Sequence, residues 1–117
     1  MSASSKNFSA EELKCTCCGE SGVQQWALDK LQMVRNSTGR PLKITSAYRC
    51  ENHPVESRKK KAGTHNMGIA FDIYTSNGAE RYQIITQGLL AGATGIGVAK
   101  SFVHLDWRED MPVVWTY

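Results

Sequence analysis

The chain has 117 residues and a mass of 13.0 kDa, which suits one domain with its own hydrophobic core, so we expect a single domain over 1–117 and a monomer. No stretch approaches the roughly 20 apolar residues of a transmembrane helix, which argues against membrane insertion. The net charge of +3 is small, and no recognition helix or stacking pattern accompanies it, so we do not expect nucleic acid as a partner.

The N-terminal residues 1–14, MSASSKNFSAEELK, lack the apolar core of a secretory signal, which predicts synthesis in the cytoplasm without a signal peptide. Within them, Ser9 followed three positions later by Glu12 forms a capping-box pattern. A short helix should therefore begin after Ser9 and end near the first cysteines.

Four cysteines are distributed unevenly: Cys15, Cys17 and Cys18 lie close together, and Cys50 follows far downstream. In a reducing compartment such a cluster favours thiols or a metal over disulfides. With His53, these cysteines offer thiolates and an imidazole to a second, structural metal such as zinc. The spacing is not that of a standard zinc finger or ribbon, so buried free thiols are the alternative.

Residues 23–37 carry apolar side chains at helical spacing, and Gly39 followed by Pro41 is a typical stop signal. The apolar stripe consists of Val23, Trp26, Ala27, Leu31 and Val34. Residues 42–48 alternate in the manner of a strand. Residues 50–64 show no periodicity and predict a long loop, whose basic run at 58–61 is either solvated or a docking surface for an anionic polymer.

Residues 69–74, IAFDIY, predict a second strand, and the sequence TSNG after them predicts a turn. A helix should follow over 79–93, where apolar residues recur at helical spacing, namely Tyr82, Ile85, Leu89 and Leu90. Three short strands are expected at 94–98, 102–107 and 113–117. Strands mixed with helices in no regular alternation indicate an α+β fold, with a small, largely antiparallel sheet and two or three helices packed on it.

Polar residues with metal-binding chemistry occur in and beside two of these strands. Because strand side chains alternate, His104 and Asp106 should share one face of the sheet. Asp72 lies in an otherwise apolar strand, where an ionised carboxylate is costly unless it meets a cation or strong donors. His65 precedes that strand by a turn containing Gly68. Two histidines and one carboxylate from separate segments are typical ligands of a catalytic zinc.

Three segments in this order resemble a known family: TSAYRCENH (45–53), GTHNMGIAFDI (63–73) and FVHLDWRED (102–110). They are similar to the signature segments of the D-Ala-D-Ala zinc metallopeptidases, which share a fold with the Hedgehog signalling domain. The resemblance covers nearly the whole chain and is strongest to the compact single-domain members of phages and prophages. It implies the same fold for this chain.

The resemblance also implies roles for individual residues. His65, Asp72 and His104 match the zinc ligands. Arg49 matches the family arginine that holds a substrate carboxylate or carbonyl and steadies the negative charge of the tetrahedral intermediate, although a surface arginine at a strand end is the alternative. Tyr48 and Ser46, in the same segment, are further substrate-binding candidates.

The sequence departs from many family members at the general base. They carry an acidic residue three positions before the second histidine, and here that position is Ser101, whose hydroxyl is far too weak a base. Asp106 is the best local substitute, and the alternative is that it orients His104. His53 is a third candidate, as a proton carrier.

The resemblance therefore implies a zinc-dependent peptidase that cleaves peptidoglycan stem peptides, as a D-Ala-D-Ala carboxypeptidase or an endolysin-like endopeptidase. Such a protein would act at the bacterial cell wall after release from the cell, or as part of a virion. Two alternatives remain: a catalytically silent, zinc-stabilised binding module, and a virion structural protein of the same fold.

Overall fold

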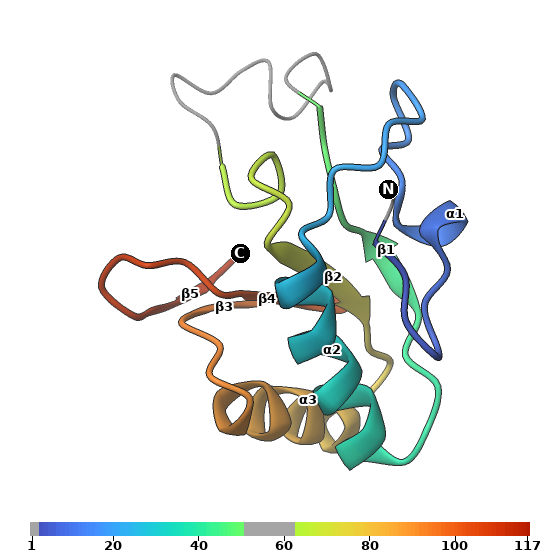
Figure 1. The fold of residues 1–117 in the computed structure, drawn as a ribbon. Coiled ribbons are helices and arrows are strands. Elements are labelled where there is room, and N and C mark those ends of the chain that lie inside the picture. The colour runs from blue at the N-terminus through green and yellow to red at the C-terminus, as the bar shows by residue number, and fades with distance from the viewer. Residues whose placement is uncertain (1–2, 51–62) are drawn as a thin grey trace.

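The computed structural model describes residues 3–50 and 63–117, and in this part of the chain helices and one sheet form an α+β fold, as predicted (Figure 1). The sheet has the strand order β1-β2-β4-β3-β5 and is antiparallel except for the β3–β5 pair. The helices are α1 (Ala10–Leu13), α2 (Gln25–Thr38) and α3 (Gly78–Leu90). The strands are β1 (Ile44–Ser46), β2 (Ala70–Tyr74), β3 (Gly95–Val98), β4 (Phe102–Asp106) and β5 (Val113–Thr116).

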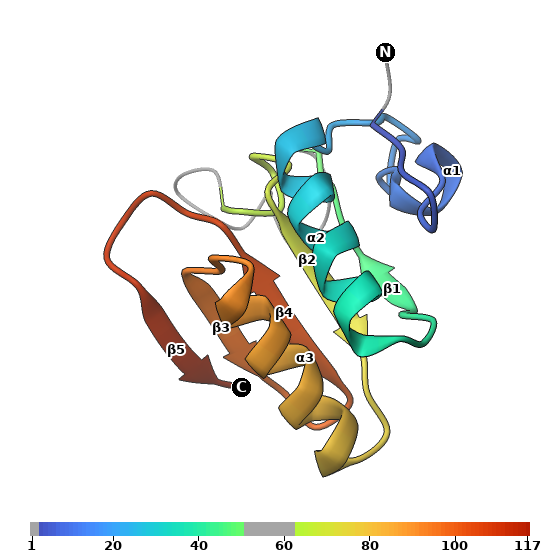
Figure 2. The same cartoon turned by 60° about the horizontal axis from the view of Figure 1, so that its bottom comes forward.

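The helices α2 and α3 lie side by side across one face of the sheet (Figure 2). Alternate residues of β2 and β4 point into the layer between sheet and helices and are fully buried, namely Phe71, Ile73, Val103 and Leu105. The glycine at position 88 lets α3 approach the sheet closely, because a Cβ there would lie 2.8 Å from the side chain of Leu105. The hydrophobic core therefore occupies one face, and the opposite face is left for polar side chains.

Two helix signals in the sequence are confirmed, one at the start of α1 and one at the end of α2. Ser9 and Glu12 form the capping box of α1, and Gly39 ends α2 with a φ of +70°. The predicted stripe of α2 was wrong at Trp26, which is 48% exposed, whereas Leu28 is completely buried. Trp26 lies in the first turn of α2 and lines a cleft described below.

The apolar spacing of α3 predicted the helix but not its buried face. Ile84 and Gly88 are buried, whereas Tyr82 is 72% and Leu90 is 75% exposed. The contact of α3 with the sheet is made mainly with β4, where the small Gly88 brings the helix close to Leu105. None of the helices in the described part of the chain is long and apolar enough to span a membrane. The predicted basic run at 58–61 and His53 lie outside the described residues.

Candidate active site

One row of paired residues crosses the sheet and carries the polar site. Ser46 of β1 pairs with Asp72 of β2, Asp72 pairs with His104 of β4, and Gly97 of β3 lies between His104 and Trp115 of β5. Paired residues of adjacent strands point to the same face, so these side chains share the face opposite the helices. His104 and Asp106 also share that face, as predicted from strand alternation.

Three predicted ligands from separate segments meet on this face. Oδ1 of Asp72 lies 3.2 Å from Nε2 of His65 and 3.1 Å from Nδ1 of His104. All three side chains are buried, and the ligand atoms lie within 4.8 Å of one another. Tetrahedral ligands about 2.0–2.1 Å from zinc are separated by about 3.4 Å, so these separations suit one zinc ion.

The second nitrogen of each histidine fixes its tautomer. Nδ1 of His65 lies 2.5 Å from the carbonyl oxygen of Ala47, which can only accept, so Nδ1 carries the proton. Nε2 of His104 lies 2.7 Å from Oδ2 of Asp106 and donates to that carboxylate. In their neutral forms both rings therefore present a lone pair toward Asp72. Three acceptors facing one another in a buried site need a cation between them, which fits a metal.

The electrostatics of these groups agree with a cation site. Burial lowers the pKa of His65, which keeps its imidazole neutral and able to ligate. Burial alone would raise the pKa of Asp72, but hydrogen bonds with His104 and His65 hold it well below its ordinary value. Burial likewise opposes protonation of His104, yet Asp106 and Asp72 raise its pKa above the ordinary value. The ionised Asp72 places negative charge where a cation would bind, and a metal would compete with the second proton of His104 for Nδ1.

The loop that presents His65 depends on two close approaches. Gly68 has a φ of +77°, and a Cβ there would overlap the carbonyl oxygen of Gly22, so no other residue fits without a shift. The amide of Gln24 donates to the carbonyl of Gly68 at 2.8 Å. The segment before α2 thus holds the ligand-bearing loop, in agreement with the turn role expected for Gly68.

Arg49 lies beside the three ligands. Its Nη2 is 3.2 Å from Oδ2 of Asp72, and its Nε donates to Oγ of Ser46 at 3.1 Å. Arg49 lines the cleft, whereas Ser46 and Tyr48 do not. The ring of Tyr48 instead occupies the space beside Gly22, where a Cβ would overlap it. Ser46 therefore positions Arg49, and neither it nor Tyr48 lines the cleft; their substrate-binding role stays a prediction.

Asp106 is completely buried and is held by Arg108 through three hydrogen bonds, of 2.9 Å from Nε, 2.6 Å from Nη2 and 3.2 Å from the backbone amide. Burial would raise the pKa of Asp106, but the bonds from Arg108 and His104 lower it below its ordinary value. Gly95 makes room for this carboxylate, because a Cβ there would overlap it. The arrangement gives His104 a fixed, ionised acceptor.

An open cleft of about 940 Å³ lies over the three ligands. Arg108, Trp115 and Tyr117 are among the lining residues to which the sequence analysis gave no role. Trp115 and Tyr117 alternate in the C-terminal segment and so share a face, and Gly97 leaves room for both rings, which lie 2.8 Å from a Cβ built there. Arg108 lies 5.1 Å from the ring of Trp115 in a cation–π arrangement. Alternation predicts that the two rings share a face, and the pairing of β5 with β3 brings that face to the site.

Two other candidate positions lie apart from the cleft. Ser101, in the place of the expected acid, is exposed just before β4 and does not line the cleft. Cys15, Cys18 and Cys50 come together as a separate group, and the exposed Cys17 lies beside it and interacts with Cys50. The structure thus brings together part of the predicted cysteine set, and His53 is not described.

The family of the chain follows from these motifs and from a direct comparison. Residues 6–106 match the family model of peptidase M15, and this span includes every predicted metal ligand of the cleft. The chain therefore belongs to the M15 peptidases, the D-Ala-D-Ala zinc metallopeptidases, which confirms the family predicted from its sequence; the phage or prophage type stays a prediction. Within the described residues, His65, Asp72 and His104 form a site in the cleft that could bind the zinc ion of this family. No curated protein matched the chain.

Proposed function

We propose that the protein hydrolyses an amide bond in peptidoglycan stem peptides, as a D-Ala-D-Ala carboxypeptidase or as an endopeptidase. The observation that carries the proposal is the convergence of His65, Asp72 and His104 below an open cleft, with both histidine tautomers fixed for ligation. Membership of the M15 peptidases supports this chemistry. The proposal includes the substrate class, peptidoglycan stem peptides. It also includes the site of action, which is the bacterial cell wall, reached after release from the cell or as part of a virion.

His65, Asp72 and His104 would hold the zinc ion, which polarises a scissile carbonyl and acidifies water when bound. Arg49 is the cation at the edge of the site, already oriented by Ser46 and Asp72. A preorganised guanidinium there stabilises the negative charge that develops on the carbonyl oxygen, or holds a substrate carboxylate.

The general base in this proposal is a carboxylate other than Asp106. Asp106 has no exposed surface, and its oxygens already accept from His104 and Arg108, which suits orientation of His104 rather than proton transfer with water. Besides Asp72, the carboxylates among the described lining residues are Glu109 and Asp110. We therefore assign the base to this pair.

The cleft wall suits a peptide with a charged end. Aromatic rings of Trp26, Trp115 and Tyr117 provide apolar contact area, and Arg49 and Arg108 provide cations for carboxylates. Stem peptides carry free carboxylates, which the arginines can bind, and short side chains, which can pack against the aromatic rings.

Incubation of the zinc-loaded protein with purified sacculi, followed by mass analysis of the released fragments, tests the proposal. Release of a terminal D-alanine indicates a carboxypeptidase, and release of cross-linked fragments indicates an endopeptidase. The His65→Ala variant, which removes a ligand, is the control and should release nothing. Tight binding of one zinc ion at this site with no fragment released from any sacculus type would instead favour the silent binding module that Ser101 suggests.

A further inference from the structure

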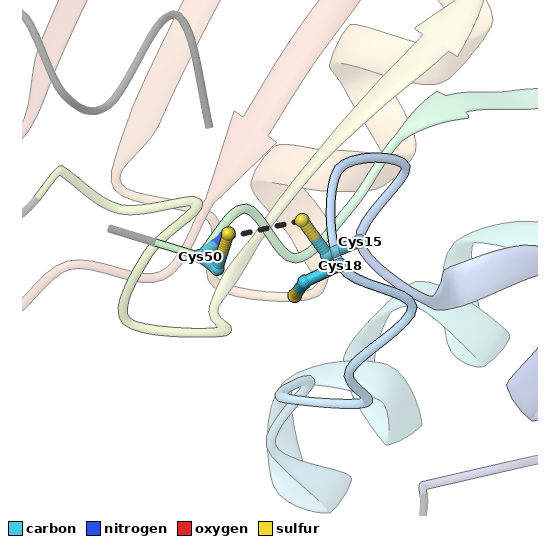
Figure 3. Close-up of side chains that lie close together, drawn as sticks. All are labelled: Cys15, Cys18 and Cys50. Atoms are coloured by element: carbon cyan, nitrogen blue, oxygen red, sulfur yellow. Dashed lines mark hydrogen bonds between the residues drawn. The ribbon is translucent and has the colours of Figure 1, made fainter. Parts of the chain in front are cut away.

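A second group of metal-ligating side chains lies outside the cleft. Cys15 and Cys18 come from the segment after α1, and Cys50 follows the end of β1 (Figure 3). Their sulfur atoms lie within 4.8 Å of one another. Thiolates bound to one zinc ion at about 2.3 Å are separated by about 3.8 Å, so only a small closure of the group is needed.

The backbone around the cysteines has the form of a ligand turn. The amide of Cys15 donates to the carbonyl of Glu20 at 2.9 Å, and the amide of Gly19 donates to the carbonyl of Cys15 at 2.9 Å. Gly19 has a φ of +75°, which lets the chain reverse directly after Cys18. The turn places Cys15 and Cys18, which are separated by two residues, on the same side, and that spacing is common in zinc sites.

Backbone amides also donate to the sulfur atoms. The amide of Cys50 lies 3.3 Å from Sγ of Cys15, and the amide of Glu20 lies 3.5 Å from Sγ of Cys18. Hydrogen bonds of this kind favour the thiolate, which is the metal-binding form of cysteine. Cys15 and Cys50 are buried and Cys18 is exposed, so the group has a protected interior and one side open to an entering ion.

We propose that Cys15, Cys18 and Cys50 bind a structural zinc ion, distinct from the metal of the cleft. Three thiolates are a donor set that zinc accepts, and the group would complete its four ligands with one further donor. The ion would join two segments that are 35 residues apart in sequence.

The position of the ion explains what it would stabilise. Cys50 directly follows Arg49, whose amide donates to the carbonyl of His65 at 3.3 Å and whose carbonyl accepts from Nδ2 of Asn66 at 2.8 Å. Fixing Cys50 to the N-terminal turn therefore fixes the chain that carries Arg49 against the loop that carries His65. The ion would not contact the substrate. It would stabilise the segment that carries Arg49, which is part of the cleft wall.

The test uses the full chain in a His65→Ala/His104→Ala background, which removes the cleft ligands, so its result does not depend on the proposed peptidase activity. After exchange with cobalt, we expect a thiolate-to-cobalt charge-transfer band and one tightly held zinc or cobalt ion per chain by elemental analysis. Cys18→Ser should abolish both. Because Cys18 is exposed, this variant should fold, which far-ultraviolet circular dichroism checks.

Ser21→Ala is the matched control, because Ser21 is an exposed residue of the same segment without a thiol, and this variant should keep the ion. Cys17 interacts with Cys50, so it is not used as the control. The proposal is overturned if the background variant holds no metal while all its thiols react freely. It is also overturned if a disulfide forms between Cys15 and Cys50 in place of metal binding, or if Ser21→Ala releases the ion and Cys18→Ser does not.

Discussion

Oδ2 of Asp106 accepts a 2.7 Å hydrogen bond from Nε2 of His104, two residues earlier on the same strand. The acceptor is held in place, because Asp106 is completely buried and Arg108 donates three further hydrogen bonds to it. The bond fixes the proton of His104 on Nε2 and leaves Nδ1 directed at Asp72. A positioning carboxylate behind a ligand histidine therefore comes from the same strand as the ligand itself.

Asp106→Asn should weaken zinc binding about 10- to 100-fold, because the amide no longer guarantees the tautomer of His104 and leaves the Arg108 guanidinium without its anion. Competition with a chromophoric chelator measures the affinity. Asp110→Asn is the control and should bind zinc as the wild type does, since among the described residues Asp110 makes no hydrogen bond or ion pair with the three ligands. Unchanged affinity with lost turnover in Asp106→Asn would return Asp106 to the role of base.

Substitution of the true base should lower kcat about 10²- to 10⁴-fold while the zinc content stays constant. We expect this of either Glu109→Gln or Asp110→Asn, the two carboxylates assigned to proton transfer. Steady-state kinetics on a stem-peptide substrate, with elemental analysis of the same samples, separates loss of chemistry from loss of metal. If both variants keep wild-type kcat, the base lies elsewhere in the chain.

Gly95→Ala should destabilise the protein by about 1–3 kcal/mol and weaken zinc binding, because its Cβ overlaps the carboxylate of Asp106 and forces that side chain to shift. Gly78→Ala is a matched control at the start of α3, where a Cβ meets nothing within 4 Å and the backbone does not need glycine. It should be neutral or stabilising by up to about 1 kcal/mol. Urea unfolding measures the free energy of unfolding of both variants. Equal changes would show that the position beside Asp106 does not require glycine.

In the metal-free protein, the lowered pKa of Asp106 makes the free energy of unfolding depend on pH in the acidic range. A carboxylate with a lowered folded pKa contributes stability that is fully present above its unfolded pKa of about 3.9 and is lost as the pH falls through the folded pKa. Below about pH 4 the free energy of unfolding should therefore fall, by up to about 1.4 kcal/mol per pH unit for this group. Asp106→Asn lacks this dependence, so its stability deficit should narrow as the pH falls. Parallel curves for the two proteins would contradict the assignment.

Local signals in the sequence predicted most of the secondary structure. The capping box at Ser9 and the glycine stop at Gly39 act within one turn of helix, so their outcome does not depend on the rest of the fold. The exposure of Trp26 and Tyr82 was not predictable in the same way. Which side of an amphipathic helix is buried depends on what it packs against, and here α3 contacts the sheet mainly through β4.

The metal ligands could be predicted because their motifs are characteristic of a family. The spacing of His65 and Asp72 in the sequence does not by itself predict that their side chains meet. Strand alternation did place His104 and Asp106 on one face. Arg108 and Trp115 were missed for a physical reason. Arg108 turns back onto Asp106 after the strand has ended, and Trp115 reaches the site through the parallel pairing of β5 with β3, a long-range contact that no local pattern encodes.

Arg49→Gln should lower kcat/KM about 10²- to 10³-fold, because the substitution removes the cation that stands beside the ligands, between Asp72 and Ser46. Arg49→Lys should recover part of the loss, since an ammonium keeps the charge but cannot make both contacts with the same geometry. Arg40→Gln, which alters an arginine paired with Glu80 outside the cleft, is the control for loss of charge.

A pair of peptides that differ only in a free or amidated C-terminus separates the two roles of Arg49. If Arg49 holds a substrate carboxylate, the wild type prefers the free acid and Arg49→Gln loses that preference, mainly through KM. If Arg49 stabilises the developing oxyanion, kcat falls on both peptides alike, because that charge forms only in the transition state. Wild-type kcat/KM on both peptides in Arg49→Gln would remove this residue from the catalytic site.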